Sequence, residues 1–329
     1  MPGLLVPATL FQLVVVLFGA LATSTAAVAY AHRVRLERPA VGVFNGRDIV
    51  VLFVFIVTLP VLYLVLPHWA LTSFLILTFL ASLSIGYRPV VRPALLWPAI
   101  GLLIGLNVWI ARTLLGTVLG WQLFWAETSL VVLLGATAVA NLYVQGGMRL
   151  RHVAWFALVL AGYDFMFSIV IPLTPKLADA FIGYPLDPSI GMRVGLFNAN
   201  IGIGDLLVYA MFTVAALKAY GRVAARWALL VVAVFGAAAP GLAPLILDAV
   251  TRGSANAVVP AQSFFGPAAF ITYRLLRRRY GTERTTGEFF AAVEAAKAAK
   301  HAAPPPPPPV ASPEPDVASV PQPELVARA

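Results

Sequence analysis

Two aspartates lie inside long apolar segments, where a charged side chain is costly. Asp164 lies in the apolar run 153–173, and Asp205 lies in the next run, 197–217. Neither run contains a Lys or Arg that could neutralise its acid. A carboxyl group at the centre of a bilayer costs about 3 kcal/mol by insertion scales, so such residues usually face a cavity and carry a function. Two carboxyls that neutralise each other by sharing a proton can act as an acid–base pair on a water molecule.

The composition indicates a membrane protein with several spans. The chain has 329 residues, of which 60% are apolar and only 11% are charged, whereas soluble domains carry about 25% charged residues. The mean hydropathy of +0.87 points the same way. The net charge of +9 does not indicate nucleic-acid binding, because the basic residues fall between the apolar runs and not on one soluble face. The composition therefore indicates the lipid bilayer as a partner, and not nucleic acid.

The sequence gives no sign of a cofactor. The absence of cysteine excludes disulfides, thiolate nucleophiles and cysteine-ligated metals. The four histidines (His32, His68, His152 and His301) lie in separate segments, and no pair has the spacing of metal ligands. We expect neither a metal nor an organic cofactor.

Nine apolar runs approach or exceed the length of about 20 residues that crosses a bilayer. They lie at 4–30, 49–66, 70–86, 93–111, 116–144, 153–173, 197–217, 227–249 and 257–276. The sequence therefore predicts an all-α fold with nine transmembrane helices over residues 1–276.

Residues 277–329 are expected to form a basic and alanine-rich cytoplasmic extension. A short helix is predicted within Thr282–His301, and a disordered tail with the six prolines Pro304–Pro309 follows it. The alternative for this tail is a docking site for a partner that reads proline-rich segments.

The distribution of Lys and Arg predicts the orientation in the cell membrane. Segments after the odd-numbered runs, together with the end of the ninth run, hold fifteen of these residues, and Lys218 is one of them. Segments after the even-numbered runs hold four. Because cytoplasmic segments carry the excess of positive charge, we expect the N-terminus outside and the C-terminus in the cytoplasm.

The two aspartates are expected at similar depths on consecutive antiparallel helices. At a rise of about 1.5 Å per residue, Asp164 is eleven residues, about 16 Å, from the cytoplasmic end of its helix. Asp205 is eight residues, about 12 Å, from the outer end of the next helix. Across a hydrocarbon layer of about 30 Å, Asp164 is then about 14 Å from the outer edge, which matches Asp205.

The neighbours of the aspartates fit a solvent-accessible site. Gly202 and Gly204 remove side chains just before Asp205, which leaves room for a water and a substrate backbone. Asn198 and Asn200 make the start of this run polar, as a wet entrance or a helix cap would be.

These residues resemble the intramembrane aspartyl proteases of the presenilin and signal peptide peptidase group. That family carries a Tyr-Asp motif in its sixth span and a Gly-x-Gly-Asp motif in its seventh, and this chain has Tyr163–Asp164 and Gly202–Asp205 in the corresponding runs. The family also has nine spans. The resemblance implies that Asp164 and Asp205 are the catalytic residues. Tyr163 would then donate a hydrogen bond near them, with ordinary helix packing as its alternative role.

A third family motif, Pro-Ala-Leu, opens the ninth span. The matching residues here are Pro260, Ala261 and Gln262, so the third position departs from the family. In the family this segment lies beside the aspartates and helps to hold the extended substrate. The resemblance thus implies a substrate-binding or supporting role for these three residues, and the departure at Gln262 bears on substrate docking more than on the chemistry.

The predicted cytoplasmic C-terminus favours the signal peptide peptidase branch over the presenilin branch. The resemblance then implies substrates that are single membrane spans with an inward N-terminus, namely type II proteins or leftover signal peptides. A homo-oligomer is an open alternative to a single chain.

Two other functions are compatible with the residues. In a proton- or cation-coupled transporter, Glu127 and Asp248 could extend a path of acids through the membrane. A catalytically inactive relative would bind transmembrane helices without cleaving them, and the departure at Gln262 is what raises this alternative.

Overall fold

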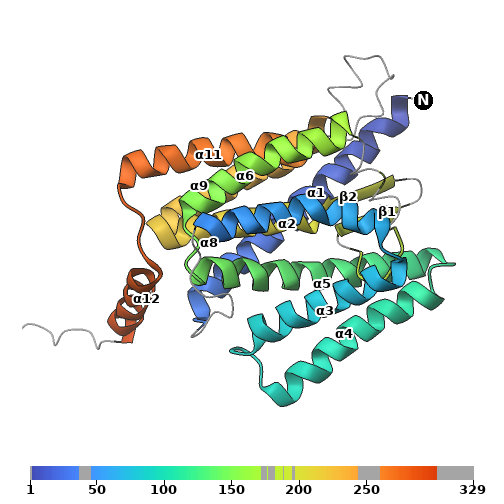
Figure 1. Ribbon diagram of the computed structural model, residues 1–329, viewed down its shortest axis with the longest axis horizontal. Helices are drawn as coiled ribbons and strands as arrows, with labels where there is room; N and C mark the ends of the chain where they lie inside the picture. The colour runs from blue at the N-terminus through green and yellow to red at the C-terminus, as the bar shows by residue number, and fades with distance from the viewer. Residues whose placement is uncertain are drawn as a thin grey trace, which may run out of the picture.

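The computed structural model describes residues 2–36, 46–171, 176, 182–187, 189–194, 197–243 and 260–301. Over these residues the chain is a bundle of long helices with one small two-stranded sheet (Figure 1). The α-helices are α1 (Pro2–Arg33), α2 (Gly46–Val65), α3 (His68–Tyr87), α4 (Pro93–Thr113), α5 (Val118–Gln145), α6 (Leu150–Phe165), α8 (Ile203–Tyr220), α9 (Arg222–Val231), α11 (Ala261–Tyr280) and α12 (Thr286–His301). Helix α6 continues into the π-helical turn η1 (Met166–Val170), and α9 continues into η2 (Val232–Ala238). The strands are β1 (Ser189–Val194) and β2 (Phe197–Gly202).

Seven helical segments are long and apolar enough to cross a membrane. They are Leu13–Arg33, His68–Tyr87, Pro93–Thr113, Val118–Gln145, Leu150–Ser168, Ile203–Tyr220 and Arg222–Ala243. Each of the nine runs expected from the sequence overlaps one long helix in the described part of the chain, and α2 and α11 are the two that are not among the seven. The prediction of a predominantly α-helical membrane protein is confirmed at this level, and the full count of nine spans stays a prediction.

The outer surface of the bundle carries large apolar side chains. Phe18, Trp69 and Leu102 are 73%, 73% and 71% exposed, respectively. A soluble monomer rarely exposes contiguous apolar surface of this kind, whereas the hydrocarbon of a bilayer would cover it.

The seventh predicted span begins later than the apolar run suggested. Residues Phe197–Gly202 form β2, which pairs antiparallel with β1 in a register that runs from Ser189 opposite Gly202 to Val194 opposite Phe197. The segment contains two Asn residues and one Gly, which are weak helix formers, and the pairing with β1 supplies the backbone hydrogen bonds that a helix would otherwise make. Helix α8 therefore starts at Ile203, and Asp205 lies in its first turn.

The expectation that Asp205 lies eight residues down a helix is therefore wrong, and the depth argued from it does not hold. The side chains of Asn198 and Asn200, which we expected at a wet entrance, lie outside the described residues.

Helix α8 is the centre of the bundle. Every residue from Val208 to Ala219 is buried, and the helix packs against α1, α5, α6, α9 and α11. A helix that is apolar on all sides is stable only when it is surrounded in this way. Because Asp205 stands at the start of this central helix, its position is fixed by the whole bundle.

Helices α6 and α11 lie side by side over much of their length (Figure 1). Gly266 of α11 permits the close approach: a methyl group at this position would lie 2.4 Å from the carbonyl oxygen of Ala157 and 2.8 Å from the Cβ atom of Ala161. The Ser263 hydroxyl donates to the carbonyl of Ala161 at 3.4 Å, nearer the start of α11. The contact thus brings the start of α11 to the end of α6.

The segment after α11 folds back onto the ends of the same helices. The carboxylate of Glu283 accepts hydrogen bonds from the backbone N–H groups of Leu150 (2.9 Å) and Arg151 (3.1 Å), which begin α6. The Arg284 guanidinium donates to the carbonyl of Leu217 near the end of α8 (3.1 Å). This segment therefore links α6 and α8 at the end of the bundle opposite the aspartates.

Helix α12 confirms the short helix predicted within Thr282–His301. Its side chains Phe289 and Phe290 are buried, and Glu294 forms an ion pair with Arg35 at 3.0 Å. The proline-rich tail that follows lies outside the described residues.

The structure places Lys218 differently from what the charge count assumed. We counted it as a loop residue, but it lies in the last turn of α8 and is buried. Its Nζ donates to the carbonyl of Val144 (2.8 Å) in the last turn of α5 and to that of Met148 (2.7 Å), three residues after this helix ends. It therefore caps a helix end and says little about orientation.

Candidate active site

Asp164 lies at the end of α6, just before η1. Its Oδ1 accepts a hydrogen bond from the Ser168 hydroxyl at 3.1 Å, and its Oδ2 accepts one from the backbone N–H of Gln262 at 3.1 Å. Ser168 follows Asp164 by four residues, so the α6–η1 turn brings it onto the same face. Two donors thus fix the carboxyl group.

The backbone N–H of Gln262 is available to Asp164 because it lies in the first turn of α11. Pro260 caps α11 in an extended conformation, with φ −71° and ψ 113°, and Ala261 is the first helical residue. The first N–H groups of a helix have no partner within it, and the N-terminus attracts negative charge. The segment Pro260–Gln262, expected to support the site, therefore contacts Asp164 through its backbone.

Asp205 is held by the side chain of the same glutamine. The Nε2 of Gln262 donates to the Oδ1 of Asp205 at 2.8 Å. Gly202 lies beside the other oxygen, since a methyl group there would be 3.7 Å from Oδ2, and the space at Gly204 is open. The room that we expected at these two glycines is present on this side of Asp205.

Gln262 joins the two aspartates. Its backbone nitrogen contacts Asp164 and its amide nitrogen contacts Asp205, so the two carboxyls lie within the span of one glutamine residue. The side chain is only 4% exposed, and its Oε1 is buried with no hydrogen-bond partner in the described part of the chain. The proximity that the sequence predicted for Asp164 and Asp205 is present. We call these two residues the aspartate pair.

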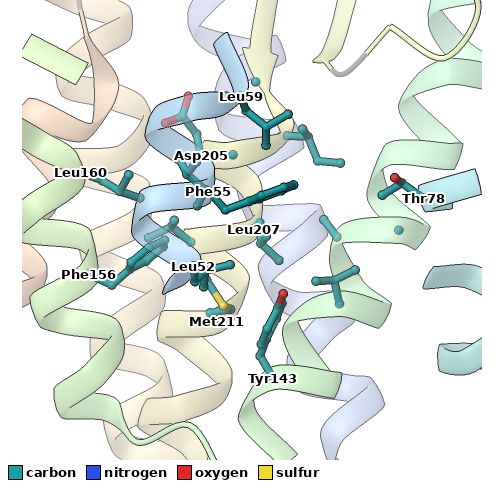
Figure 2. Close-up of a pocket in the computed structure, with 18 of the residues that line it drawn as sticks. Leu52, Phe55, Leu59, Thr78, Tyr143, Phe156, Leu160, Asp205, Leu207 and Met211 are labelled. Atoms are coloured by element: carbon teal, nitrogen blue, oxygen red, sulfur yellow. The ribbon is translucent and has the colours of Figure 1, made fainter. Parts of the chain in front are cut away.

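The aspartate pair borders an apolar cavity of about 500 Å³. Its walls come from α2, α3, α5, α6 and α8, and Gln262 contributes from α11. In the view of Figure 2, Asp205 and Leu59 lie toward the upper end and Tyr143 and Met211 toward the lower end. The six residues from Asp205 to Met211 correspond to about 9 Å along α8. The cavity therefore extends from the acids along the interior of the bundle.

Tyr163 lines this cavity, but it does not contact the aspartate pair by a hydrogen bond in the described residues. Its ring packs against Phe167, with 4.6 Å between ring centroids. The packing role, which we gave as its alternative, is the one that the structure displays.

Tyr209 was not predicted from the sequence. It follows Asp205 by one helical turn, is fully buried, and packs its ring on Phe265 of α11. Its hydroxyl donates to the carbonyl of Gly236 at 2.9 Å. Tyr209 therefore joins α8 to η2 and to α11 one helical turn beyond Asp205.

Glu127 belongs to a different cluster. Its Oε2 accepts a hydrogen bond from the Nδ2 of Asn107, whose Oδ1 accepts from the backbone N–H of Leu186 at 2.6 Å. Glu127 does not border the cavity at the aspartate pair, and Asp248 lies outside the described residues. The described structure thus does not connect these acids in a path. Within it, no group of three or more His, Asp or Glu residues could hold a metal ion.

Comparison of the chain with family models, with curated proteins and with solved structures gives no match. The resemblance to intramembrane aspartyl proteases therefore rests on the motif residues and on their placement.

Proposed function

We propose that this chain is an intramembrane aspartyl endopeptidase that hydrolyses peptide bonds within transmembrane segments. One observation carries the proposal: Asp164 of α6 and Asp205 of α8 meet at Gln262, at the border of a large apolar cavity. Paired acids of this kind activate a water without a metal. An apolar cavity beside them suits the side chains of a membrane-spanning peptide.

The reaction would use the aspartate pair as general base and general acid. The ionised member takes a proton from a water, and the water oxygen attacks the carbonyl carbon of the peptide bond. The protonated member donates to the carbonyl oxygen, where negative charge develops. The tetrahedral intermediate then collapses: the C–N bond breaks, the nitrogen leaves with the proton that the first aspartate took from the water, and a hydroxyl of the intermediate returns its proton to the other aspartate, so that the pair again holds one proton.

The substrate segment must unwind at the cleaved bond, because the carbonyl of a regular helix is hydrogen-bonded and shielded. The freed backbone groups then need partners inside the bundle. Pro260 and β2 have extended backbone, and β2 ends at Gly202 beside Asp205, so this backbone would supply such partners. The apolar side chains of the segment would occupy the cavity.

The proposal includes nine spans, with α2 and α11 added to the seven apolar helices, in the cell membrane. It also includes an outer N-terminus and a cytoplasmic C-terminus, as the charge distribution predicts. The expected substrates are type II spans or leftover signal peptides.

The experiment uses purified protein in liposomes with a fluorescent type II span as substrate. Wild-type protein should release products that mass spectrometry assigns to cleavage inside the span. The isosteric variants Asp164→Asn and Asp205→Asn should each lower the rate on the order of 10³-fold or more, because neither amide can move the proton. Thermal melting and gel filtration verify that both variants fold.

Glu127→Gln is the matched control. It also removes a buried carboxyl from the bundle, but one that does not border the cavity, so cleavage should persist. Cleavage that survives in either Asn variant removes the aspartate pair from the mechanism. Ion-dependent uptake without cleavage would identify a transporter, and binding of spans without cleavage would identify an inactive relative.

A further inference from the structure

Gln262 is positioned to do more than link two helices. Its amide group contacts Asp205 through Nε2 at 2.8 Å, while its Oε1 is buried and has no partner among the described residues. A buried acceptor without a partner is unfavourable, so a side chain is seldom held in such a place without compensation. The compensation here is the contact with a carboxyl group that the proposed reaction uses.

A buried carboxyl that changes its protonation state needs two different partners. The ionised form only accepts hydrogen bonds, whereas the protonated form also carries an O–H donor. In the proposed reaction one aspartate gains a proton from water while the other gives its proton up, so both change state in every turnover. Asp205 thus needs a donor in one half of the cycle and an acceptor in the other.

A primary amide can supply both partners from one place. Its oxygen and NH₂ group are almost equal in size, so a half-turn of the amide exchanges them within nearly the same volume. A side chain as enclosed as that of Gln262 can make this exchange without new space in either end state. The Oε1 that has no partner in the structure would face Asp205 after the half-turn.

We infer that Gln262 positions Asp205 for the proposed reaction: its amide donates to this carboxyl when it is ionised, and accepts from it when it is protonated and no substrate carbonyl is in place. This inference rests on the proposed function. It gives a chemical meaning to the departure from the Pro-Ala-Leu motif, because leucine at position 262 could make neither hydrogen bond. The departure then belongs to the chemistry, whereas the sequence suggested that it concerns docking.

The test replaces Gln262 with Leu, which restores the family motif, and with Met, which matches the length of glutamine without polar atoms. Both variants should lower kcat by about 10- to 100-fold, the worth of one hydrogen bond to a charged group. KM should be unchanged, because the lost interaction acts on the aspartate pair and not on the bound substrate. A transition-state analogue should lose affinity in parallel with kcat, and an uncleavable substrate peptide should not.

Phe264→Leu is the matched control on the same turn. Phe264 is 39% exposed and does not border the cavity at the aspartate pair, so kcat should be unchanged. All rates are expressed per folded molecule from gel filtration, which separates a folding defect from a chemical one.

The outcomes distinguish this inference from the function beneath it. Absence of cleavage by the wild-type protein overturns both. Cleavage by Gln262→Leu at the wild-type rate overturns the inference alone, as does a change confined to KM, which would mean that position 262 only docks the substrate.

Discussion

Gly266→Ala tests whether the close contact between α6 and α11 positions Asp164. The added methyl group would lie 2.4 Å from the carbonyl oxygen of Ala157, whereas carbon and oxygen atoms in contact are about 3.3 Å apart or more. It would also lie 2.8 Å from the Cβ atom of Ala161, against about 3.5 Å or more for two carbon atoms. The nearer atom is backbone and cannot rotate away. The two helices must therefore separate by about 1 Å at this point.

The expected consequence is a displacement of Gln262, which lies four residues before Gly266 on α11. The hydrogen bond from the Gln262 backbone to Asp164, now 3.1 Å, would lengthen to about 4 Å and be lost if the start of α11 moves with the helix. Overpacking of this kind costs about 1–3 kcal/mol of stability. A catalytic group displaced by about 1 Å can lower the rate by up to about 100-fold. We therefore expect a lower melting temperature together with a fall in kcat that exceeds the loss of folded protein.

The assay combines thermal melting in detergent with cleavage of a fluorescent span in liposomes. Gly162→Ala is the control. Gly162 lies on α6, two residues before Asp164, and a methyl group added there would have open space around it. This variant should cleave at the wild-type rate and melt slightly higher, since Ala is favoured over Gly in a helix. Wild-type kcat in Gly266→Ala would refute the reasoning and assign the placement of Asp164 to other contacts.

Two further predictions concern the supports of the same helices. Glu283→Ala removes the acceptor of the backbone N–H groups of Leu150 and Arg151 at the start of α6, so it should lower the stability of the protein by about 0.5–2 kcal/mol. Glu283→Gln should cause a smaller loss in the same thermal or denaturant melting experiment. An unchanged melting point would show that this helix cap is dispensable. Tyr209→Phe removes the buried hydrogen bond to the carbonyl of Gly236, so it should lower stability by about 0.5–1.5 kcal/mol while kcat per folded molecule is retained. A selective loss of kcat would give the hydroxyl a direct part in the reaction.

The helices could be predicted from the sequence because a long apolar run reports its own length and composition. Each of the nine runs corresponds to a helix in the described chain, and seven of these are long and apolar enough to span. One helix start was predicted wrongly: the apolar run 197–217 begins with β2, and the helix starts only at Ile203. Its conformation depends on pairing with β1, a partner that composition within one run does not reveal.

The site could be predicted in part. The motifs around Asp164 and Asp205 indicated a pair of acids, and the structure brings both to Gln262. The contacts of Gln262 with both aspartates could not be predicted, because they depend on how closely α11 approaches α6 at Gly266. The contact of Ser168 with Asp164 could have been suspected from its spacing of four residues. The cavity walls from α2, α3 and α5 could not be predicted, because a cavity depends on how separate elements pack together.

The helix ends make an argument for a polar site that is independent of any motif. Helix α6 passes into a π-helical turn beside Asp164, α8 begins two residues before Asp205, and α11 begins at Ala261. Three interruptions of regular helix therefore meet at one place inside an apolar bundle. Backbone groups freed in this way are tolerated at membrane depth only where they border a cavity or find polar partners. Here one freed N–H already binds the carboxyl of Asp164, so an interruption that would destabilise a purely structural bundle provides a donor for the proposed site.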